Sequence, residues 1–449
     1  MRYLPQTPEE ITSMCQKIGV SEVDELFHVI PEHLQLKGLL DLPKPLSEAE
    51  LTQELKSMSR QNQSVDNLAS FLGGGAYHHY VPVAVTSLIS RGEFMSAYTP
   101  YQPEISQGTL QSIFEFQSMM ASLTGMELAN ASNYDGASAV AEAALMAMRV
   151  TKRSKILVSP SLHPQYRQVL ETYLEGVEAV IETLAQEPES GRVQVASLKE
   201  KLDETVAGVI IQSPNAFGVV EDFETLAGIT KEAGALSIAA FSEALSLSFL
   251  KSFGSMGADI VVGEGQSLGN FLNLGGPYLG IFATLKKYVR QMPGRLVGET
   301  TDAAGKRGFV LVLSTREQHI RREKATSNIC TNQGLCALTT AIYLSLMGPQ
   351  GMDYLAKINF SYAEFLKEAL LKIPGVKLKF SGATFNEFVI ELPKPASEVL
   401  ARLLEAGILG GIDLGTWDKT LKNCLLVCAT EMNTKAQMEN YGRYLKKLL

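Results

Sequence analysis

The chain has 449 residues, of which 45% are hydrophobic and 20% charged, and its formal net charge is −8. This composition is typical of a packed globular protein and excludes the disordered and fibrous classes. The acidic balance argues against a nucleic-acid partner, because dedicated nucleic-acid binders usually carry a basic stripe. Five cysteines spread over this length do not make a disulfide framework, so we expect a cytoplasmic protein.

The sequence does not predict a membrane partner either. The longest stretch without a charged residue is 325–352, and within it only Leu335–Met347 is strongly apolar. A helix needs about 20 apolar residues to cross a bilayer. We therefore expect Leu335–Met347 to form a buried core helix.

Residues 1–70 are predicted to form a helical N-terminal arm. Thr7-Pro8-Glu9-Glu10 combines a capping residue, a proline that favours the first helical turn and two acidic residues. Ser47-Glu48-Ala49-Glu50 has the S-x-x-E form of a capping box. Pro43-Lys44-Pro45 separates the two helical pieces. Because nothing here carries chemistry, we expect the arm to pack on a neighbouring chain.

Residues 71–349 are predicted to form a large α/β domain. Short β-rich runs alternate with helix-like stretches such as Ala139–Met148, Gln165–Glu175 and Glu224–Ala233. The runs lie at 156–158, 179–181, 209–211, 238–240, 260–262 and 310–312. This alternation indicates a mainly parallel sheet covered on both faces, with ligands beyond the carboxyl ends of its strands.

Residues 350–449 are predicted to form a small α+β C-terminal domain. Strand-like runs at Val376–Phe380 and Phe388–Leu392 precede a helical stretch at Glu398–Ala406. Leu425–Cys428 and a final helix follow.

A glycine-rich loop at 263–269 invites a dinucleotide-binding interpretation, which we reject. The Rossmann fingerprint needs a third glycine where this chain has Leu268, and it needs a helix to follow. Residues 270–277 contain helix breakers instead, and the preceding strand is late in the series.

Metal binding and serine-type nucleophilic catalysis are also disfavoured. Cys424 and Cys428 are not accompanied by a histidine pair at zinc spacing, so buried structural cysteines are expected. His78 and His79 are adjacent, and neighbours on a helix or strand point in different directions. No Ser-His-Asp set is apparent in the sequence either.

Three other segments leave alternatives open. The segment that begins at Gly73-Gly74-Gly75 and ends in the aromatic, proline and amide run 98–108 is either a structured surface loop or a binding element. The helix start at 133–138 could hold a phosphate, although a plain N-cap by Asp135 or Ser138 is commoner. A basic region at 290–324 is either a solvated face, a docking patch for an acidic partner or the rim of an anionic cofactor site.

Five segments together resemble one family. They are YTPYQPEISQG at 98–108, NASNYDGASA at 130–139, GEGQSLG at 263–269, GGP at 275–277 and RREKATSNICTNQ at 321–333. They resemble glycine dehydrogenase (decarboxylating), the P-protein of the glycine cleavage system, and the resemblance covers essentially the whole chain. The chain length is similar to that of the alpha subunit of the split bacterial form.

The resemblance implies a fold, a reaction and partners. The implied fold is that of the fold-type I pyridoxal-phosphate enzymes, with a large mainly parallel sheet domain, a helical arm and a small α+β domain. The implied reaction is glycine decarboxylation with transfer of the aminomethyl group to the lipoyl arm of H-protein. The implied partners are a beta subunit, lipoylated H-protein and glycine, and pyridoxal phosphate is expected on the beta subunit.

The resemblance also implies a degenerate cofactor pocket in this chain. Aligned on the turn at 275–277, the family's cofactor-binding lysine falls on Gln266, and an amide cannot form an imine. The carboxylate position opposite the pyridine nitrogen, usually aspartate, falls on Glu243. His163 matches the histidine that stacks on the cofactor ring, and Ser138 falls near the phosphate-binding turn. No self-sufficient catalytic residue is expected.

Residues of this chain are expected to act across a subunit interface. By position, the resemblance implies that the aromatic run would line the approach of glycine or the lipoyl arm, and that two loop residues would reach the phosphate held by the partner. The run contributes Tyr98, Tyr101, Gln102 and Glu104, and the loop contributes Asn328 and Thr331.

Three competing functions remain at this stage. The chain could be a self-sufficient pyridoxal-phosphate enzyme that uses another lysine, such as Lys251 or Lys286. It could be a non-catalytic subunit that stabilises the beta chain. A dinucleotide-dependent dehydrogenase is the third, and Leu268 disfavours it.

Overall fold

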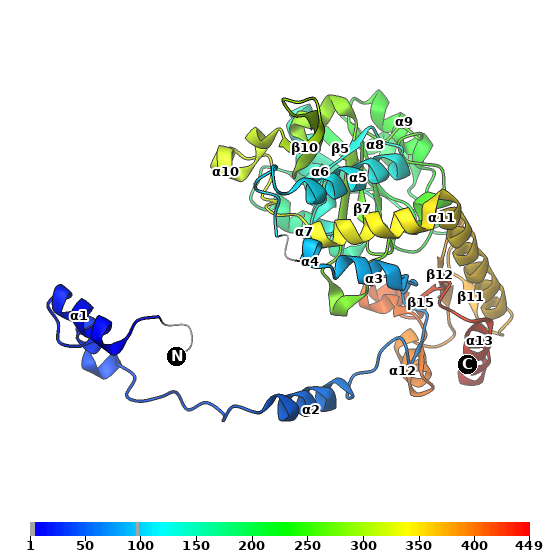
Figure 1. The fold of residues 1–449 in the computed structure, drawn as a ribbon. Coiled ribbons are helices and arrows are strands. Elements are labelled where there is room, and N and C mark those ends of the chain that lie inside the picture. The colour runs from blue at the N-terminus through cyan, green and yellow to red at the C-terminus, as the bar shows by residue number, and fades with distance from the viewer. Residues whose placement is uncertain (1–4, 96–97) are drawn as a thin grey trace. The chain divides into compact units, whose positions relative to one another are not determined.

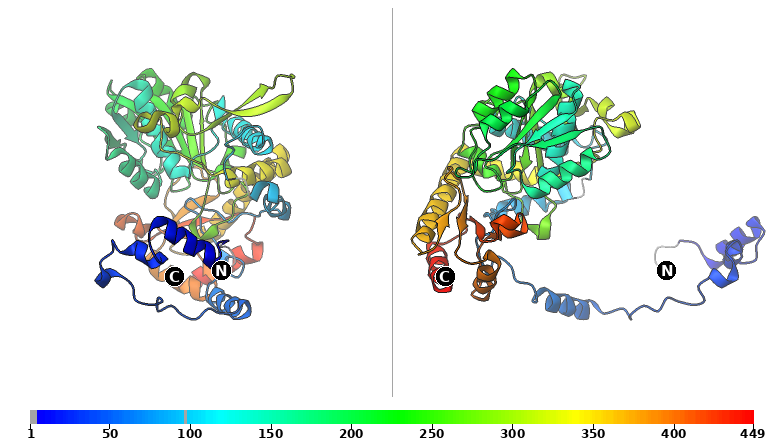
Figure 2. Two further views of the ribbon diagram at one scale, coloured as in Figure 1. Left: turned by 60° about the vertical axis from the view of Figure 1, so that its left-hand side comes forward. Right: turned by 180° about the vertical axis from the view of Figure 1, so that it is seen from behind.

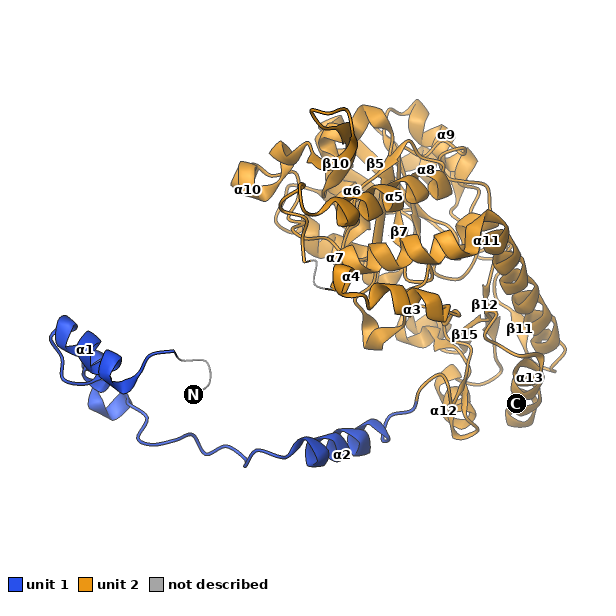
Figure 3. Cartoon of the chain, in the orientation of Figure 1, with its two compact units in different colours: residues 1–63 blue, residues 64–449 orange. Residues whose placement is uncertain are grey.

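The structure is a computed structural model that describes residues 5–95 and 98–449 (Figure 1). The chain divides into two compact units, residues 1–63 and 64–449, which are coloured separately in Figure 3. The predicted boundaries at residues 70 and 350 stay predictions. In the described part of the chain, no helix combines the length and apolar character that crossing a membrane requires.

The first unit contains two capped helices. Helix α1 (Pro8–Ile18) begins after a capping box made by Thr7 and Glu10, and α2 (Glu48–Ser59) begins after one made by Ser47 and Glu50. Both predicted helix starts are confirmed. Two short 3-10 helices lie between them, η1 (Val23–Phe27) and η2 (Glu32–Leu34). Among the described residues of this unit, Cys15 alone is buried.

A seven-stranded sheet forms the centre of the second unit. Its strand order is β2-β8-β7-β6-β5-β3-β4, and the strands from β7 to β4 run parallel. Strand β8 pairs antiparallel with β7, and β2 pairs antiparallel with β8. The bounds are β2 (Leu128–Ala129), β3 (Lys155–Val158), β4 (Val180–Thr183), β5 (Val206–Gln212), β6 (Leu236–Phe241), β7 (Ile260–Glu264) and β8 (Gly280–Thr284). The predicted mainly parallel sheet is confirmed.

Helices cover both faces of this sheet, as Figure 2 shows. Successive residues of β6 point to opposite faces, so Phe241 packs in one core with Phe116 and Phe223, and Ala240 packs in the other with Tyr166 and Leu170. The first core takes α5 (Gln107–Thr124), α8 (Val195–Lys201) and α9 (Phe223–Glu232). The second takes α6 (Gly136–Thr151) and α7 (Pro164–Leu174).

Helix α11 (Gly334–Leu371) connects the large sheet to a smaller one, and it is kinked at Gly348, where φ is 60°. Its first half contains the predicted core helix, with Ala337 and Tyr343 fully buried. The smaller sheet has the order β11-β12-β15-β14. Its bounds are β11 (Lys377–Leu378), β12 (Glu387–Glu391), β14 (Ile412–Asp413) and β15 (Cys424–Cys428), with α12 (Ala396–Glu405) and α13 (Lys435–Leu448) nearby.

The start of the second unit is joined to its C-terminal part. Strand β1 (Ala69–Ser70) pairs with β13 (Ile408–Leu409). The chain then continues through 71–82 to α3 (Val83–Ile89) and α4 (Gly92–Met95).

One predicted strand lies outside the parallel sheet. The run at 310–312 belongs to β10 (Arg307–Val312), which pairs antiparallel with β9 (Leu296–Thr301) in a separate two-stranded ribbon. The short turn at 302–306 allows hairpin pairing, whereas a parallel partner needs a long crossover. The prediction that this run joins the parallel sheet was therefore wrong.

Candidate functional site

Four residues predicted for the cofactor pocket lie at the carboxyl edge of the large sheet or at the helix starts beside it. Gln266 follows β7, Glu243 follows β6 and His163 follows β3, while Ser138 lies in the first turn of α6. All four are nearly buried, with exposed fractions of 5% or less. Gln266, Glu243 and His163 each have a hydrogen bond to the stretch Gly73–Tyr80, and Ser138 has one at the start of α6.

We call Gly73–Tyr80 the plug segment. The amide of Gln266 is fully engaged with it: Oε1 accepts from the backbone N–H of Tyr77 at 2.8 Å, and Nε2 donates to the Tyr77 carbonyl at 3.0 Å. Nε2 also donates to the carbonyl of Asn270 at 2.8 Å. At the position predicted to correspond to a lysine, a neutral amide therefore pairs with main chain.

His79 lies between two carboxylates. Its Nε2 is 3.1 Å from Glu243 Oε2, and its Nδ1 is 2.8 Å from Glu431 Oε2. Burial alone would lower the pKa of His79, but the charges of Glu431 and Glu243 outweigh it and raise this pKa to about 10. Burial would likewise raise the pKa of Glu431, but the attraction of His79 prevails and lowers it to about 2. The His79 side chain is therefore an imidazolium that donates from both ring nitrogens.

Both carboxylates also accept hydrogen bonds from neutral donors. Glu243 accepts from the Asn386 amide at 3.0 Å and from the Leu245 N–H at 2.9 Å. Glu431 accepts from the Tyr80 N–H at 2.7 Å and from the Asn359 amide at 2.9 Å. The buried charges thus have the hydrogen bonds that burial requires.

Tyr77 is fully buried and fills the space beside these groups. Its hydroxyl donates to Glu387 Oε2 at 2.8 Å and lies 3.1 Å from Ser242 Oγ. Glu387 Oε1 accepts from the Gly74 N–H at 2.6 Å. Burial raises the pKa of Glu387 to about 7. The plug segment is therefore held by side-chain as well as main-chain hydrogen bonds.

His163 contacts the glycines of the plug segment. Its Nε2 donates to the Gly74 carbonyl at 2.9 Å, and its ring meets Trp417 edge-on at 5.4 Å between centroids. Burial lowers the pKa of His163. A Cβ at Gly75, where φ is +103°, would lie 3.5 Å from His163 Nε2. The main chain thus lies close to the imidazole.

Carboxylates of the chain occupy the start of α6. Asp135 Oδ1 accepts from the Ser138 N–H at 2.7 Å in a capping box, and Glu264 Oε2 accepts from the Gly136 N–H at 3.0 Å. Glu264 Oε1 also accepts from the N–H groups of Gln266 and Leu279. Burial raises the pKa of Glu264 to about 8. Of the two uses considered for this turn, the N-cap is the one present.

The aromatic run and the loop before α11 lie side by side. Tyr101 lines a cavity of about 540 Å³ together with Ile329, Cys330, Arg295 and Glu317. Arg295 Nε donates to Glu317 Oε2 at 3.3 Å. Two atoms in this cavity wall, Arg295 Nη1 and Glu317 Oε1, are buried and have no hydrogen-bond partner within residues 5–95 and 98–449.

The other residues predicted for an interface are mostly exposed. Tyr98 is 76% exposed and Tyr101 68% exposed. Gln102 and Glu104 are also exposed, and Asn328 accepts from the Gln318 amide at 2.8 Å. Thr331 is half-buried in the same loop as Asn328.

The basic region does not form one patch. Arg295 and Arg316 are buried, and Arg316 donates to the carbonyls of Met292 and Gly294. Arg307 is exposed and pairs with Glu299 at 2.7 Å. At least three of these cations therefore have structural partners.

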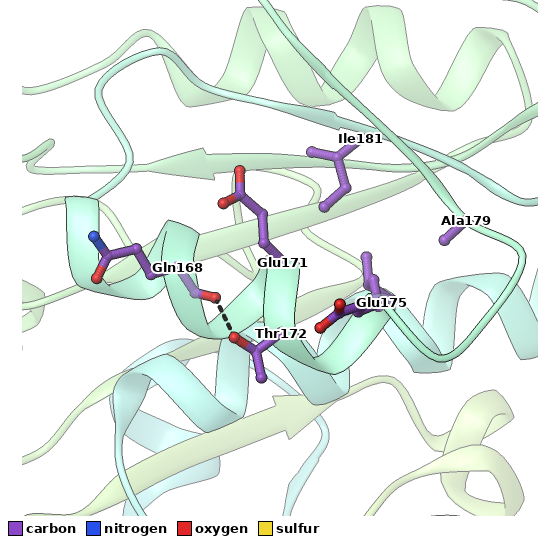
Figure 4. Close-up of a pocket in the computed structure, with 7 residues that line it drawn as sticks. Gln168, Glu171, Thr172, Glu175, Ala179 and Ile181 are labelled. Carbon is purple, nitrogen blue, oxygen red and sulfur yellow. Dashed lines mark hydrogen bonds between the residues drawn. The ribbon is translucent and has the colours of Figure 1, made fainter.

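Other candidate sites gain no support from the geometry. Lys251 is exposed and pairs with Glu224 at 2.7 Å, and Lys286 is exposed. A cavity of about 520 Å³ lies between α7 and β4 and involves none of the predicted residues. Figure 4 shows side chains that line it, among them Glu171 and Glu175. The described residues contain no cluster suited to a metal ion, and their five cysteines are free.

The main contacts of the pocket were not predicted from the sequence. His79 was considered only as half of an improbable chelate, and no role was assigned to Tyr77, Glu387 or Glu431. The available signal was the run of three glycines before an aromatic residue and two histidines, because such a run lets main chain approach other groups closely.

The two sheets and the long helix between them define the fold-type I class of pyridoxal-phosphate enzymes. The structure is similar to a sphingosine-1-phosphate lyase of Burkholderia pseudomallei, with a TM-score of 0.67 at 15% identity over 93% of this chain and 94% of the other. It is also similar to an apo cysteine desulfurase of Thermococcus onnurineus, with a TM-score of 0.63 at 16% identity over 85% and 95%. These two likenesses concern the fold alone.

The family follows from closer relatives. The family described as glycine cleavage system P-protein matches residues 1–444. A probable glycine dehydrogenase (decarboxylating) subunit 1 of Parvibaculum lavamentivorans is 49% identical over 100% of both chains, and one of Desulforamulus reducens is 50% identical over 98% of both. A crystal structure of an inhibitor-bound glycine decarboxylase (P-protein) has a TM-score of 0.90 at 44% identity over 100% of both chains. The chain belongs to the glycine cleavage system P-protein family.

Pyridoxal phosphate, which the fold class uses, does not fit the residues of this pocket. Gln266 offers no amine, and its amide is saturated by main chain. The imidazolium of His79 already faces Glu243. Asp135 and Glu264 already accept from N–H groups at the start of α6, which leaves fewer donors for a phosphate.

Proposed function

We propose that this chain is the partner-dependent alpha subunit of a glycine decarboxylase. With a beta subunit, it decarboxylates glycine and the aminomethyl group passes to the lipoyl arm of H-protein. The beta subunit holds the pyridoxal phosphate. The observation that carries the proposal is the amide of Gln266, which is buried and bonded to main chain at the position that corresponds to the family's lysine.

In this proposal the chain completes the active site from across the interface. Tyr98, Tyr101, Gln102 and Glu104 line the approach of glycine or the lipoyl arm. Their exposure supports this role, because large exposed aromatic side chains are typical of contact surfaces. Asn328 and Thr331 reach the phosphate on the partner.

The cavity beside Tyr101 supports the proposal that a second chain covers this part of the surface. Buried polar atoms normally have hydrogen-bond partners, yet Arg295 Nη1 and Glu317 Oε1 have none among the described residues. In this proposal the two side chains rearrange when a partner chain covers the cavity, and they then find the missing acceptor and donor.

The N-terminal unit supports a role in assembly. Residues 5–63 do not bury their apolar side chains among themselves, as Leu39, Val29 and Leu42 illustrate. In this proposal the surface of the partner removes these side chains from water. The free cysteines favour the reducing cytoplasm as the compartment.

The test is a reconstitution. The chain and the beta subunit are purified separately, and glycine-dependent exchange of carbon dioxide is measured with lipoylated H-protein. We expect activity in the mixture alone. Activity of this chain without its partner, together with pyridoxal on a lysine such as Lys251 or Lys286, would support the self-sufficient alternative instead.

A further inference from the structure

We propose that the plug segment is a built-in substitute for the cofactor: the imidazolium of His79 is the resident cation opposite Glu243, and Tyr77 and the main chain beside it fill the remaining space. Residues of the chain itself thereby fill the pocket of the large domain, and no ligand is needed there. This inference rests on the proposed function only in treating Glu243 and Gln266 as a former cofactor site.

The hydrogen-bond pattern carries the argument for a cation. Both ring nitrogens of His79 face carboxylate oxygens, at 3.1 Å and 2.8 Å. A neutral imidazole has a lone pair on one nitrogen, which would point at a carboxylate oxygen. Two donors are therefore needed, and only the protonated ring has them.

No other cationic side chain among the described residues is close enough to pair with these two carboxylates. Within 4 Å of the carboxylates of Glu243 and Glu431, His79 is the only basic side chain among the described residues. Asn386 and Asn359 contribute neutral amides. Tyr77, whose ring centroid is 6.3 Å from that of His79, is kept neutral because burial raises its pKa.

The glycines explain how main chain reaches this position. At Gly73 a Cβ would lie 2.2 Å from Glu387 Oε1, and at Gly74, where φ is +66°, it would lie 2.4 Å from Ile412 Cδ1. Only glycine allows the segment to pass so close to the small sheet. The segment then leads into α3 and α4, so it also anchors the chain that continues to the aromatic run.

The experiment is chemical rescue of a cavity variant of the full chain. His79→Gly removes the imidazolium and leaves two buried carboxylates, so we expect Tm to fall by roughly 5–10 °C. Imidazole at millimolar concentrations should raise Tm of this variant in a saturable way. Pyrazole, a ring of the same size that stays neutral, should not.

His78→Gly is the matched control, since His78 is the neighbouring residue and has the same loss of side chain. We expect a smaller fall in Tm and no specific response to imidazole. Equal Tm values for the two variants, or an equal response to imidazole and pyrazole, would overturn the inference.

Two measurements on the unaltered chain keep the inference testable if His79→Gly does not fold. Nitrogen-15 NMR of labelled histidine should show both ring nitrogens of His79 protonated at pH 8, whereas one unprotonated nitrogen would refute the cation. Pyridoxal phosphate should leave Tm unchanged, and a saturable rise would show that the pocket still accepts it. These experiments use neither glycine nor the partner, so their failure would leave the proposed function standing.

Discussion

Gln266 and His79 satisfy buried polar groups in complementary ways. The neutral amide of Gln266 pairs one acceptor and two donors with main chain, so no charge is buried there. His79 does bury a charge, but it lies between two carboxylates whose other oxygens accept from the N–H groups of Leu245 and Tyr80. Breaking such a pair is costly, because the remaining charge stays buried without a partner.

The stability that His79 contributes should depend on pH. Its pKa in the folded chain is about 10, above the ordinary value of 6.5. A raised pKa means that the contribution is fully present below pH 6.5 and is lost as the pH rises through 10. We expect His79→Gln to lower the free energy of unfolding by about 3 kcal/mol at pH 7. The difference between the unaltered chain and the variant should become smaller toward pH 10. Urea unfolding at both pH values measures this, and a constant gap would contradict the pairing.

The plug segment gives a second prediction at this scale, because its glycines lack space for a side chain. A Cβ at Gly73 would collide with Glu387 and Cys428, whereas a Cβ at Gly228 in α9 would meet nothing within 4 Å. Gly73→Ala should therefore lower the free energy of unfolding by about 2 kcal/mol or more, and Gly228→Ala should raise it by up to about 1 kcal/mol. Denaturant titration compares the two, and equal effects would show that the plug segment is not held as described.

For helices and strands, the sequence revealed features that depend on neighbouring residues and did not reveal which distant segments pair. The capping boxes of α1 and α2 and the strands β3 to β7 were predictable, since each depends on a few neighbouring residues. The hairpin of β9 and β10 was assigned to the wrong sheet. The contact between His79 and Glu431 joins residues 352 positions apart, so no spacing rule could indicate it.

The aromatic run and the loop at 328–331 lie side by side around one cavity, and substitutions at Tyr101 and Thr331 should affect turnover rather than folding. Tyr101→Ala and Thr331→Ala should each lower the exchange rate of the reconstituted complex by tenfold or more, by about 1.4 kcal/mol or more in activation free energy. Tyr354→Ala is the matched control, since Tyr354 in α11 is also 68% exposed. Carbon dioxide exchange assays and the Tm of each variant distinguish an effect on turnover from an effect on folding. An unaltered exchange rate in both variants would favour a subunit that only stabilises the beta chain.

For the whole molecule, we infer that the two compact units have different roles, one in folding stability and the other in assembly. Residues 64–449 contain the sheets and their cores, whereas the described part of residues 1–63 buries little besides Cys15. Family and fold were predictable because several segments of the sequence are long and specific. The filling of the pocket was not predictable, since the amide expected at Gln266 does not indicate which residues fill the space beside it.

Removal of the first unit should therefore separate folding from assembly. A chain that begins at Ser64 should keep Tm within a few degrees of the full chain, because it retains its cores. Its affinity for the beta subunit should fall at least tenfold. Sedimentation of the mixed chains measures this, and undiminished affinity would contradict a role of the arm in assembly.

In the proposed complex, the beta subunit holds the pyridoxal phosphate, and this chain contributes residues that line the active site from across the interface. The most direct measurement is borohydride reduction of the reconstituted complex, followed by peptide mass spectrometry of both chains. We expect a phosphopyridoxyl group on one lysine of the beta subunit and on no lysine of this chain. A modified lysine at stoichiometric yield in this chain would contradict it.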